Sequence, residues 1–401
     1  MKGESVPILK MVGPVDRVLG RVRGERSGPT LLCVGGMHGN EPAGVYALQS
    51  VLAQLSDLAD EMAGEFVALA GNRAALAEGR RYIDRDLNRA WTVERLATLR
   101  NGGPKGVEDQ EQVELLDAIE EVVEEARGPV YVLDLHTMSS TGAPFSTFGD
   151  TLPNRDFAEH IPVPMILGLE ELVKGTLLGF LGAHGLVAVA FESGQHLEPK
   201  AVDRAEAGIW ISLVTAKLLP EGRVPMLAGG KKALQREAVG LPRALEMRYR
   251  HDIAPGDGFR MQPGYQNFQY VARGEVLARD ARGDVTVHER SRVLMPLYQE
   301  QGEDGFFLVR EFSSFWLRVS YVLRCAEVDR IAHWLPGVSR DPREPDTLHV
   351  NKHVARWFAK QFFHLLGFRE LEDVGEHLAM RRRRFDEARF ISKGPTPEHL
   401  E

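Results

Sequence analysis

The chain has 401 residues, of which 43% are hydrophobic and 26% charged, so it is long enough to bury a large core and to form two or three domains. Its formal net charge of −8 gives no global attraction to nucleic acid or to an anionic membrane, because both need clustered positive charge. The two cysteines, Cys33 and Cys325, are too few for a disulfide framework or a thiolate zinc cluster and indicate a reducing compartment.

The N-terminal segment, MKGESVPILK, has no apolar stretch of signal-peptide length. The most apolar region, residues 163–191, is interrupted by charged residues, whereas a membrane span needs about 20 consecutive apolar residues. We therefore expect a cytoplasmic protein with a small-molecule partner and with neither a nucleic-acid nor a membrane partner. A homo-oligomer remains open.

Short apolar runs alternate with helical stretches through the first half of the chain. The pattern predicts strands at residues 30–34, 66–70, 130–135 and 186–191, and helices at residues 43–58 and 108–126. This order is typical of an α/β fold with a parallel or mixed sheet. The second helix carries acids between its apolar positions, and we expect them to form a solvated face.

The composition and the hydrophobic pattern of the sequence change after Pro220. A linker rich in glycine and lysine is expected at residues 225–232, followed by a smaller β-rich domain with strands at residues 271–278, 285–287, 292–297 and 306–309. Helical periodicity at residues 319–334, 353–366 and 370–384 then predicts a helical C-terminal extension, in which the basic run of residues 381–384 is solvated. The predicted domains are therefore residues 1–220, 221–310 and 311–401.

The strongest chemical signal is the segment GGMHGNEP at residues 35–42, directly after the first predicted strand. If Glu41 and Pro42 open the next helix and Asn40 caps it, His38 and Glu41 can converge on one point beyond the carboxyl end of the strand. Open α/β sheets place their sites at that end. The alternative is a turn histidine beside a glutamate that the helix dipole favours.

His136 supplies a third candidate ligand, because it ends the apolar strand of residues 130–135. Catalytic zinc takes three protein ligands and leaves one position to water, and two histidines with one glutamate form a known set. We therefore predict one zinc ion per chain on His38, Glu41 and His136.

Two further segments carry candidate catalytic or binding groups. The run RRYIDRDLNR at residues 80–89 is either a solvated loop or an anion site, and Asn88 with Arg89 suits capture of a carboxylate. Glu192 breaks the apolar run at residues 186–191, and a carboxylate beside zinc can take a proton from water and deliver it to a leaving nitrogen. By itself, Glu192 could equally be a helix cap or a paired surface residue.

With these four motifs at residues 36–41, 81–89, 134–137 and 192–194, in this order along the chain, residues 1–310 resemble the succinylglutamate desuccinylase and aspartoacylase family, a branch of the zinc carboxypeptidase superfamily. The resemblance implies a carboxypeptidase-like mixed sheet flanked by helices, with the β-rich domain narrowing the cleft around residues 262–267. It also implies hydrolysis of the amide of a small N-acyl amino acid, by zinc-activated water with Glu192 as general base and acid.

The same resemblance implies a role for each remaining site residue. Arg81 would polarise the scissile carbonyl, Asn88 and Arg89 would hold the amino acid carboxylate, and Asp86 and Asp134 would orient Arg89 or a zinc ligand.

Two departures from the family pattern bear on the substrate. Residues 178–184 read LGFLGAH, where aspartoacylases carry an additional arginine for the substrate's side-chain carboxylate. The tyrosine that those enzymes bring from the second domain matches Phe306 or Phe307, which lack a hydroxyl. N-acetylaspartate is therefore not the expected substrate.

Three alternatives stay open at the level of sequence. A zinc metallocarboxypeptidase would use the same chemistry on peptides in an open cleft, and an ester hydrolase would use it on a different bond. A non-catalytic zinc-binding protein is the alternative of another class, although zinc binding alone needs neither Arg81 nor Glu192.

Overall fold

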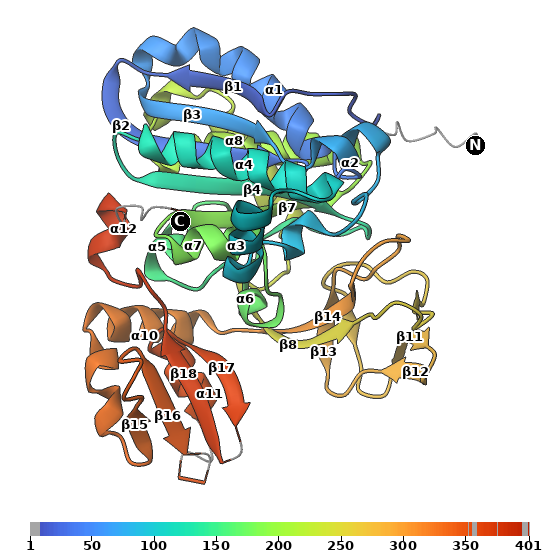
Figure 1. Ribbon diagram of the computed structural model, residues 1–401, viewed down its shortest axis with the longest axis vertical. Coiled ribbons are helices and arrows are strands. Elements are labelled where there is room, and N and C mark those ends of the chain that lie inside the picture. Colours follow the sequence, from blue (N-terminus) through green and yellow to red (C-terminus); the bar gives the residue numbers. More distant parts are fainter. Residues whose placement is uncertain (1–8, 352, 355–358, 375, 395–399, 401) are drawn as a thin grey trace.

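The computed structural model describes residues 9–351, 353–354, 359–374, 376–394 and 400. It has an α/β body from which two smaller units extend, one built around β11 to β14 and the other from the C-terminal part of the chain (Figure 1). The predicted α/β fold with a mixed sheet is confirmed.

The centre of the body is a group of parallel strands. Strand β2 (Arg26–Gly35) lies between β3 (Ala63–Ala70) and β4 (Val130–Met138), and β4 pairs on its other side with β7 (Val187–Gln195). These are the four strands predicted in the first half of the chain. Residues 31–34 in the middle of β2 are fully buried, as expected for a parallel strand covered on both faces.

Helices cover both faces of this sheet. Helices α1 (Ala43–Leu55) and α8 (Pro199–Thr215) share one hydrophobic core with it, and α4 (Val107–Glu124) and α7 (Leu177–Ala183) share another. The predicted capping of α1 by Asn40 is wrong, because Pro42 occupies the N-cap position and the Asn40 amide bonds Gln299 instead. Shorter helical segments complete the body: η1 (Ser56–Glu61), α2 (Arg73–Glu78), η2 (Leu87–Arg89), α3 (Val93–Gly102), α5 (Leu152–Glu159) and α6 (Leu169–Leu172).

The central sheet continues into the β-rich part of the chain. Within the described residues it has eleven strands, in the order β1-β3-β2-β4-β7-β5-β6-β8-β14-β13-β10. Strand β8 makes the transition, because it pairs with β6 in the body and with β14 in the β-rich part. The strands not yet bounded are β1 (Val18–Arg23), β5 (Phe145–Phe148), β6 (Met165–Leu167), β8 (Ala244–Asp252), β10 (Tyr270–Val271), β13 (Ser291–Leu294) and β14 (Asp304–Glu311).

A small three-stranded sheet of β9 (Arg260–Met261), β11 (Val276–Asp280) and β12 (Gly283–Thr286) completes the β-rich part. The predicted linker at residues 225–232 is wrong. After η3 (Glu221–Arg223), these residues enter helix α9 (Leu227–Glu237), which packs against α8 through buried Leu227 and Leu234. Packing of its apolar face outweighs the low helix propensity of Gly229 and Gly230.

The predicted helical character of the C-terminal extension is wrong for residues 370–384. They form most of the hairpin β17 (Phe368–Val374) and β18 (His377–Arg382), which joins β15 (Val338–Arg340) and β16 (Thr347–Asn351) in an antiparallel sheet. Phe368 and Met380 reach a core with Leu348 and Val350, so tertiary packing overrides the helix propensity of the glutamate- and arginine-rich sequence.

Helices complete the C-terminal unit. The predicted helix at residues 319–334 is split into α10 (Ser314–Cys325) and η4 (Val328–Trp334), because Glu327 adopts a left-handed conformation with φ of 54°. Of the helix predicted at residues 353–366, residues 359–365 form α11 (Ala359–Leu365), residues 353 and 354 form a turn instead, and residues 355–358 lie outside the described residues. Helix α12 (Arg389–Lys393) returns to pack against α5.

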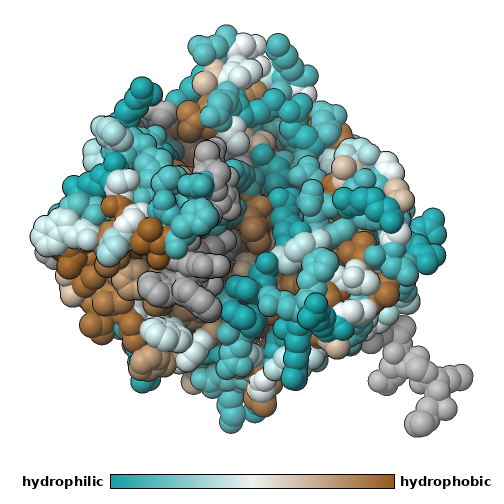
Figure 2. Space-filling view, turned by 90° about the horizontal axis from the view of Figure 1, so that it is seen from below, coloured by the Kyte–Doolittle hydropathy of each residue, from teal (hydrophilic) through white to brown (hydrophobic). Residues whose placement is uncertain are grey.

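The surface of the molecule is mostly hydrophilic on the face seen in Figure 2, with a hydrophobic cluster on the side of the C-terminal unit. Exposed aromatic side chains of that unit include Phe315, Trp316 and Tyr321 of α10. Across the described residues, we find no helix that combines the length and the apolar character required to span a membrane.

Candidate metal centre and cleft

The loop after β2 turns sharply enough to aim two side chains back over the sheet. Gly36 adopts φ of 72°, and a Cβ on Gly39 would lie 2.0 Å from the backbone of Ala75. Only glycine fits both positions without displacing the chain. The glycines of the GGMHGNEP segment are therefore what allows His38 and Glu41 to face the end of β4.

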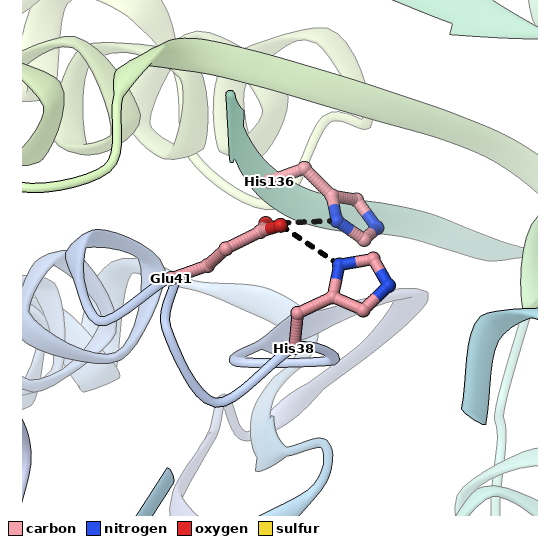
Figure 3. A group of neighbouring side chains, drawn as sticks. All are labelled: His38, Glu41 and His136. Atoms are coloured by element: carbon pink, nitrogen blue, oxygen red, sulfur yellow. Dashed lines mark hydrogen bonds and ion pairs between the residues drawn. The ribbon is translucent and has the colours of Figure 1, made fainter. Parts of the chain in front are cut away.

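His38, Glu41 and His136 form a buried cluster at the carboxyl ends of β2 and β4 (Figure 3). Glu41 lies between the two imidazoles: its Oε1 is 2.8 Å from Nδ1 of His38, and its Oε2 is 3.1 Å from Nδ1 of His136. One ligand atom from each residue lies within 4.8 Å of the others. The structure thus brings together the three residues predicted to hold zinc.

The outward-facing ring nitrogens of both histidines contact carboxylates. Nε2 of His38 lies 3.1 Å from Oδ1 of Asp86, and Nε2 of His136 lies 2.9 Å from Oδ2 of Asp134. Metal-bound histidines almost always have such a partner, which fixes the tautomer and the ring orientation. The donor set and its supporting carboxylates therefore fit a divalent cation, and zinc is the usual ion for two histidines and one glutamate.

The charges of the cluster also favour a bound divalent cation. Glu41, Asp86 and Asp134 are buried carboxylates, and among the described residues Arg81 is the one guanidinium that contacts them. Burial alone would lower the pKa of His136, but Asp134 and Glu41 outweigh it and raise that pKa well above its ordinary value. The excess negative charge that draws a proton onto His136 is the charge that a divalent cation would balance.

Arg81 lies beside the cluster. Its Nε and Nη2 donate to Oδ2 of Asp86 at 3.1 and 2.8 Å, and its Nη1 is 3.6 Å from Oε1 of Glu41. Burial alone would raise the pKa of Asp86, but Arg81 and His38 hold it well below its ordinary value. Asp86 thus remains ionised and fixes the guanidinium at the cleft, next to the three candidate ligands.

The loop that carries Arg81 is held by a residue that sequence reasoning dismissed. Glu108, in the first turn of α4, is buried, and its carboxylate accepts hydrogen bonds from the backbone N–H groups of Ile83, Asp84 and Arg85 at 2.6, 2.8 and 3.3 Å. The expectation that the acids of this helix form a solvated face is wrong at its N-terminal turn. Helical spacing marks Glu108 as polar but does not show that the loop of residues 80–89 folds over it.

Asn88 and Arg89, the residues predicted to bind a carboxylate, lie in η2 and line the cleft. Asn88 Oδ1 accepts from the backbone N–H of Leu177 at 2.9 Å, and its Nδ2 lies 3.5 Å from Nε2 of His136. Nη2 of Arg89 donates to Oδ2 of Asp304 at 2.6 Å, and the other oxygen of Asp304 accepts from Nε of Arg250 at 2.5 Å. Arg89 is therefore anchored from the β-rich part of the chain.

Glu192 follows the buried apolar run of residues 187–191 in β7 and lies directly opposite His136 in the parallel pairing with β4. Its Oε2 is enclosed and has no hydrogen-bond partner, although the residue as a whole is half-buried and lines the cleft. Burial raises the pKa of Glu192 to about 8, and Glu41 and Asp134 add to this against the opposing charge of His136. A carboxyl group with this pKa can both accept and release a proton near neutral pH.

Sequence reasoning missed two residues that tie the β-rich part to the metal centre. Gln299 accepts from Asn40 at 2.7 Å and lies 2.8 Å from Nε2 of His196, whose Nδ1 is 2.8 Å from the hydroxyl of Thr137. His196 follows Glu192 closely and could have been found as another polar residue at a strand end. Gln299 has no such signal, because it is 259 residues from Asn40 in the sequence.

A cleft lies over these groups and encloses about 1040 Å³ of empty space, including the part in contact with solvent. All seven predicted site residues line it or its floor: His38, Glu41, Arg81, Asn88, Arg89, His136 and Glu192. The β-rich part contributes residues between 295 and 307 to the wall, whereas residues 262–265 of the segment expected there line a separate surface depression.

The sequence is similar to known hydrolases. Residues 27–158 match the model of the family described as succinylglutamate desuccinylase/aspartoacylase catalytic domain. A probable aspartoacylase of Prochlorococcus marinus is 36% identical over 125 residues, and the N-acyl-aromatic-L-amino acid amidohydrolase (carboxylate-forming) of Rattus norvegicus is 36% identical over 117 residues. The succinylglutamate desuccinylase of Burkholderia mallei is 25% identical over 283 residues.

These matches differ in extent. They cover 31%, 27% and 67% of this chain, and the chain spans 39%, 34% and 75% of the respective relatives. Among solved structures, the succinylglutamate desuccinylase/aspartoacylase from Rhodobacter sphaeroides has a TM-score of 0.55 at 20% identity, covering 74% of this chain and 88% of that one. The succinylglutamate desuccinylase from Vibrio cholerae has a TM-score of 0.51 at 14% identity, covering 77% and 93%. These two likenesses show the shared fold.

Proposed function

We propose that the chain is a zinc-dependent hydrolase that cleaves the amide bond of a small N-acyl amino acid, because residues 27–158 match the succinylglutamate desuccinylase/aspartoacylase catalytic domain and a succinylglutamate desuccinylase is similar over 283 residues. The observation that carries the proposal is the unpartnered Oε2 of Glu192 beside the cluster of His38, Glu41 and His136. A protein that only stored or sensed zinc would have no use for a free, enclosed carboxylate next to the ligands.

His38, Glu41 and His136 would hold the ion, with Asp86 and Asp134 fixing the two imidazoles. Zinc bound there supplies a Lewis acid that increases the acidity of water and polarises a carbonyl group. Glu192 takes a proton from the attacking water and later delivers it to the amide nitrogen as that nitrogen leaves. Its half-buried position and raised pKa suit both transfers.

Two arginines of the chain serve the substrate. Arg81, held by Asp86, presents its guanidinium beside the metal centre and stabilises the negative charge that develops on the carbonyl oxygen. Arg89, held by Asp304, binds the carboxylate of the amino acid together with the side-chain amide of Asn88, which lines the cleft next to His136. The enclosed floor and the single carboxylate anchor favour small substrates over long peptides.

The test is the metal content of the purified protein together with release of free amine from a panel of N-acyl amino acids. We expect about one zinc per chain and hydrolysis that a chelator abolishes and added zinc restores. Glu192→Gln should retain zinc and lose activity by about 10²–10⁴-fold, because the amide cannot transfer the proton. Glu124→Gln, on the exposed part of α4, is the matched control and should behave as wild type.

Two results would overturn the proposal. Stoichiometric zinc with no hydrolysis of amides, peptides or esters would leave a non-catalytic zinc-binding protein. Release of amino acids from peptides in preference to N-acyl amino acids would indicate a metallocarboxypeptidase.

A further inference from the structure

Much of the lining of the cleft is apolar. Its wall combines side chains from separate elements: Phe148 at the end of β5, Leu169 and Val173 in and after α6, Leu178 in the first turn of α7, and Met295 and Leu297 between β13 and β14. Leu169, Leu178, Met295 and Leu297 are only half-buried, so they remain accessible from the cleft. The body and the β-rich part thus build one hydrophobic surface together.

The same region offers no uncommitted positive charge. Among the described residues that line the cleft, the guanidinium and ammonium groups belong to Arg81 and Arg89. Arg81 is engaged by Asp86, and Arg89 by Asp304. One carboxylate of a substrate can share Arg89, but a second would have no cation to receive it.

The remaining charged residues of the wall are acidic. Glu170 lines the cleft and pairs at 2.9 Å with Arg383 of the C-terminal unit. Glu303 also lines the cleft and is exposed. A second carboxylate entering here would lose water and face negative charge without compensation. An apolar group would instead replace water against leucine, methionine and phenylalanine side chains.

We propose that the cleft selects substrates with a single carboxylate and an uncharged, apolar group at the other end, and rejects N-acyl amino acids with a second carboxylate. The inference rests on the proposed function and specifies its substrate class. The apolar group is either the acyl chain or the amino acid side chain, and Leu178 is a specificity-determining residue that contacts it.

The test uses two pairs of substrates. The two members of a pair differ only at one end, which carries either two methyl groups or a carboxylate. N-acetyl-L-leucine and N-acetyl-L-aspartate compare a side chain ending in two methyl groups with one ending in a carboxylate. N-(4-methylpentanoyl)-L-alanine and N-succinyl-L-alanine make the same comparison in the acyl group. We expect kcat/KM to favour the apolar member by about 100-fold in at least one pair, which also identifies the end that the wall receives. A dicarboxylate that is equal or better in both pairs would overturn the inference.

A substitution in the wall tests the residue assignment. Leu178→Arg places a guanidinium at the accessible first turn of α7 and should shift the ratio of kcat/KM toward the dicarboxylate by about ten-fold or more. Leu178→Met keeps the volume and the apolar character and should leave the preference unchanged. An unchanged ratio in a folded Leu178→Arg protein would exclude Leu178 from specificity.

Binding measurements distinguish a failure of this inference from a failure of the proposed function. Calorimetric titration of Glu192→Gln protein with the same four compounds reports affinity without turnover. Tighter binding of an apolar member, combined with no hydrolysis by wild type, would overturn the proposed function and support the apolar cleft. Tighter binding of the dicarboxylates, or binding of none of the four, would overturn the apolar cleft.

Discussion

Glu192 is the residue whose surroundings matter most for the proposed chemistry. Its carboxyl group lies across from His136 on neighbouring strands, with one oxygen enclosed and unpartnered. Folding therefore disfavours the charged form, and the pKa of Glu192 rises to about 8, compared with about 4.3 for an exposed glutamate.

This pKa predicts how the stability of the metal-free protein depends on pH. Below about pH 4, Glu192 is protonated in the folded and unfolded states alike. Between about pH 4 and pH 8 the unfolded chain loses this proton while the folded chain retains it, so the folded state binds more protons and becomes less stable as pH rises. Glu192→Gln cannot ionise and should lack this contribution.

Urea unfolding of both metal-free proteins at pH 5, 6.5 and 8 measures the difference. The variant should gain stability over wild type as pH rises, by an amount on the order of a few kcal/mol at pH 8. A difference that stays constant with pH would show that Glu192 already ionises in the folded protein at low pH.

Asp304 defines the position of Arg89 at the other end of the site. It accepts from Arg89 with one oxygen and from Arg250 with the other. In Asp304→Asn, the side chain keeps its shape but loses the charge-assisted pairing, so Arg89 is less well fixed for a substrate carboxylate. We expect KM to rise by about ten-fold with kcat nearly unchanged.

The measurement is steady-state kinetics on the best substrate of the panel. Asp284→Asn, which removes an exposed pair with Arg279 in the small β-sheet, serves as the control and should leave KM unchanged. A fall in kcat at constant KM would assign Asp304 to the chemical step instead of to binding.

At the scale of elements, helix α4 supports the loop that carries Arg81. Glu108 accepts three backbone hydrogen bonds from this loop and a fourth from the side chain of Asn72 at 3.0 Å. Glu108→Ala would leave these donors unsatisfied in a buried place. We expect a loss of about 1–3 kcal/mol of unfolding free energy, and a loss of activity because Arg81 is no longer held in position.

Denaturant unfolding and activity assays on the same preparation test this expectation. Asp117→Ala on the exposed side of the same helix is the matched control and should change stability by less than about 0.5 kcal/mol. If Glu108→Ala lost stability but retained full activity, the loop would be positioned by other contacts.

At the scale of the whole molecule, the C-terminal unit supports the wall of the cleft. Arg383 is buried and donates to Glu170 and Glu171 of α6, at 2.9 Å in each case. The expectation that the basic run of residues 381–384 is solvated is therefore wrong at Arg383. The contact ties the C-terminal unit to the helix that carries Leu169.

Removing this arginine should affect both stability and substrate binding. Arg383→Gln removes the buried cation that Glu170 and Glu171 share and leaves Glu171 with its contact to His364, so we expect a loss of about 3 kcal/mol. The loosened wall should also raise KM for apolar substrates. Arg381→Gln, which removes a more exposed pair with Glu344 from the same strand region, should cost less than about 1 kcal/mol.

Urea unfolding and steady-state kinetics on both variants test the expected losses of stability and of substrate binding. Equal destabilisation by the two substitutions would contradict the role assigned to Arg383. A destabilised Arg383→Gln protein with unchanged KM would show that the wall does not depend on the C-terminal unit.

The sequence by itself determined the elements and residues that depend on short-range patterns. The four central strands are continuous apolar runs, and His38, Glu41, His136 and Glu192 each lie at or just beyond the end of such a run. Parallel strands bring their carboxyl ends to one edge of a sheet, so the grouping of these residues follows from their place along the chain.

Only the tertiary structure decided which distant residues complete the site. Asp304 is 215 residues from Arg89, and the apolar wall combines side chains from separate elements of the body and the β-rich part. The strands β17 and β18 form because Phe368 and Met380 find a shared core with β16, against their local helical pattern. These features depend on packing between segments far apart in the chain, and periodicity within one segment carries no information about them.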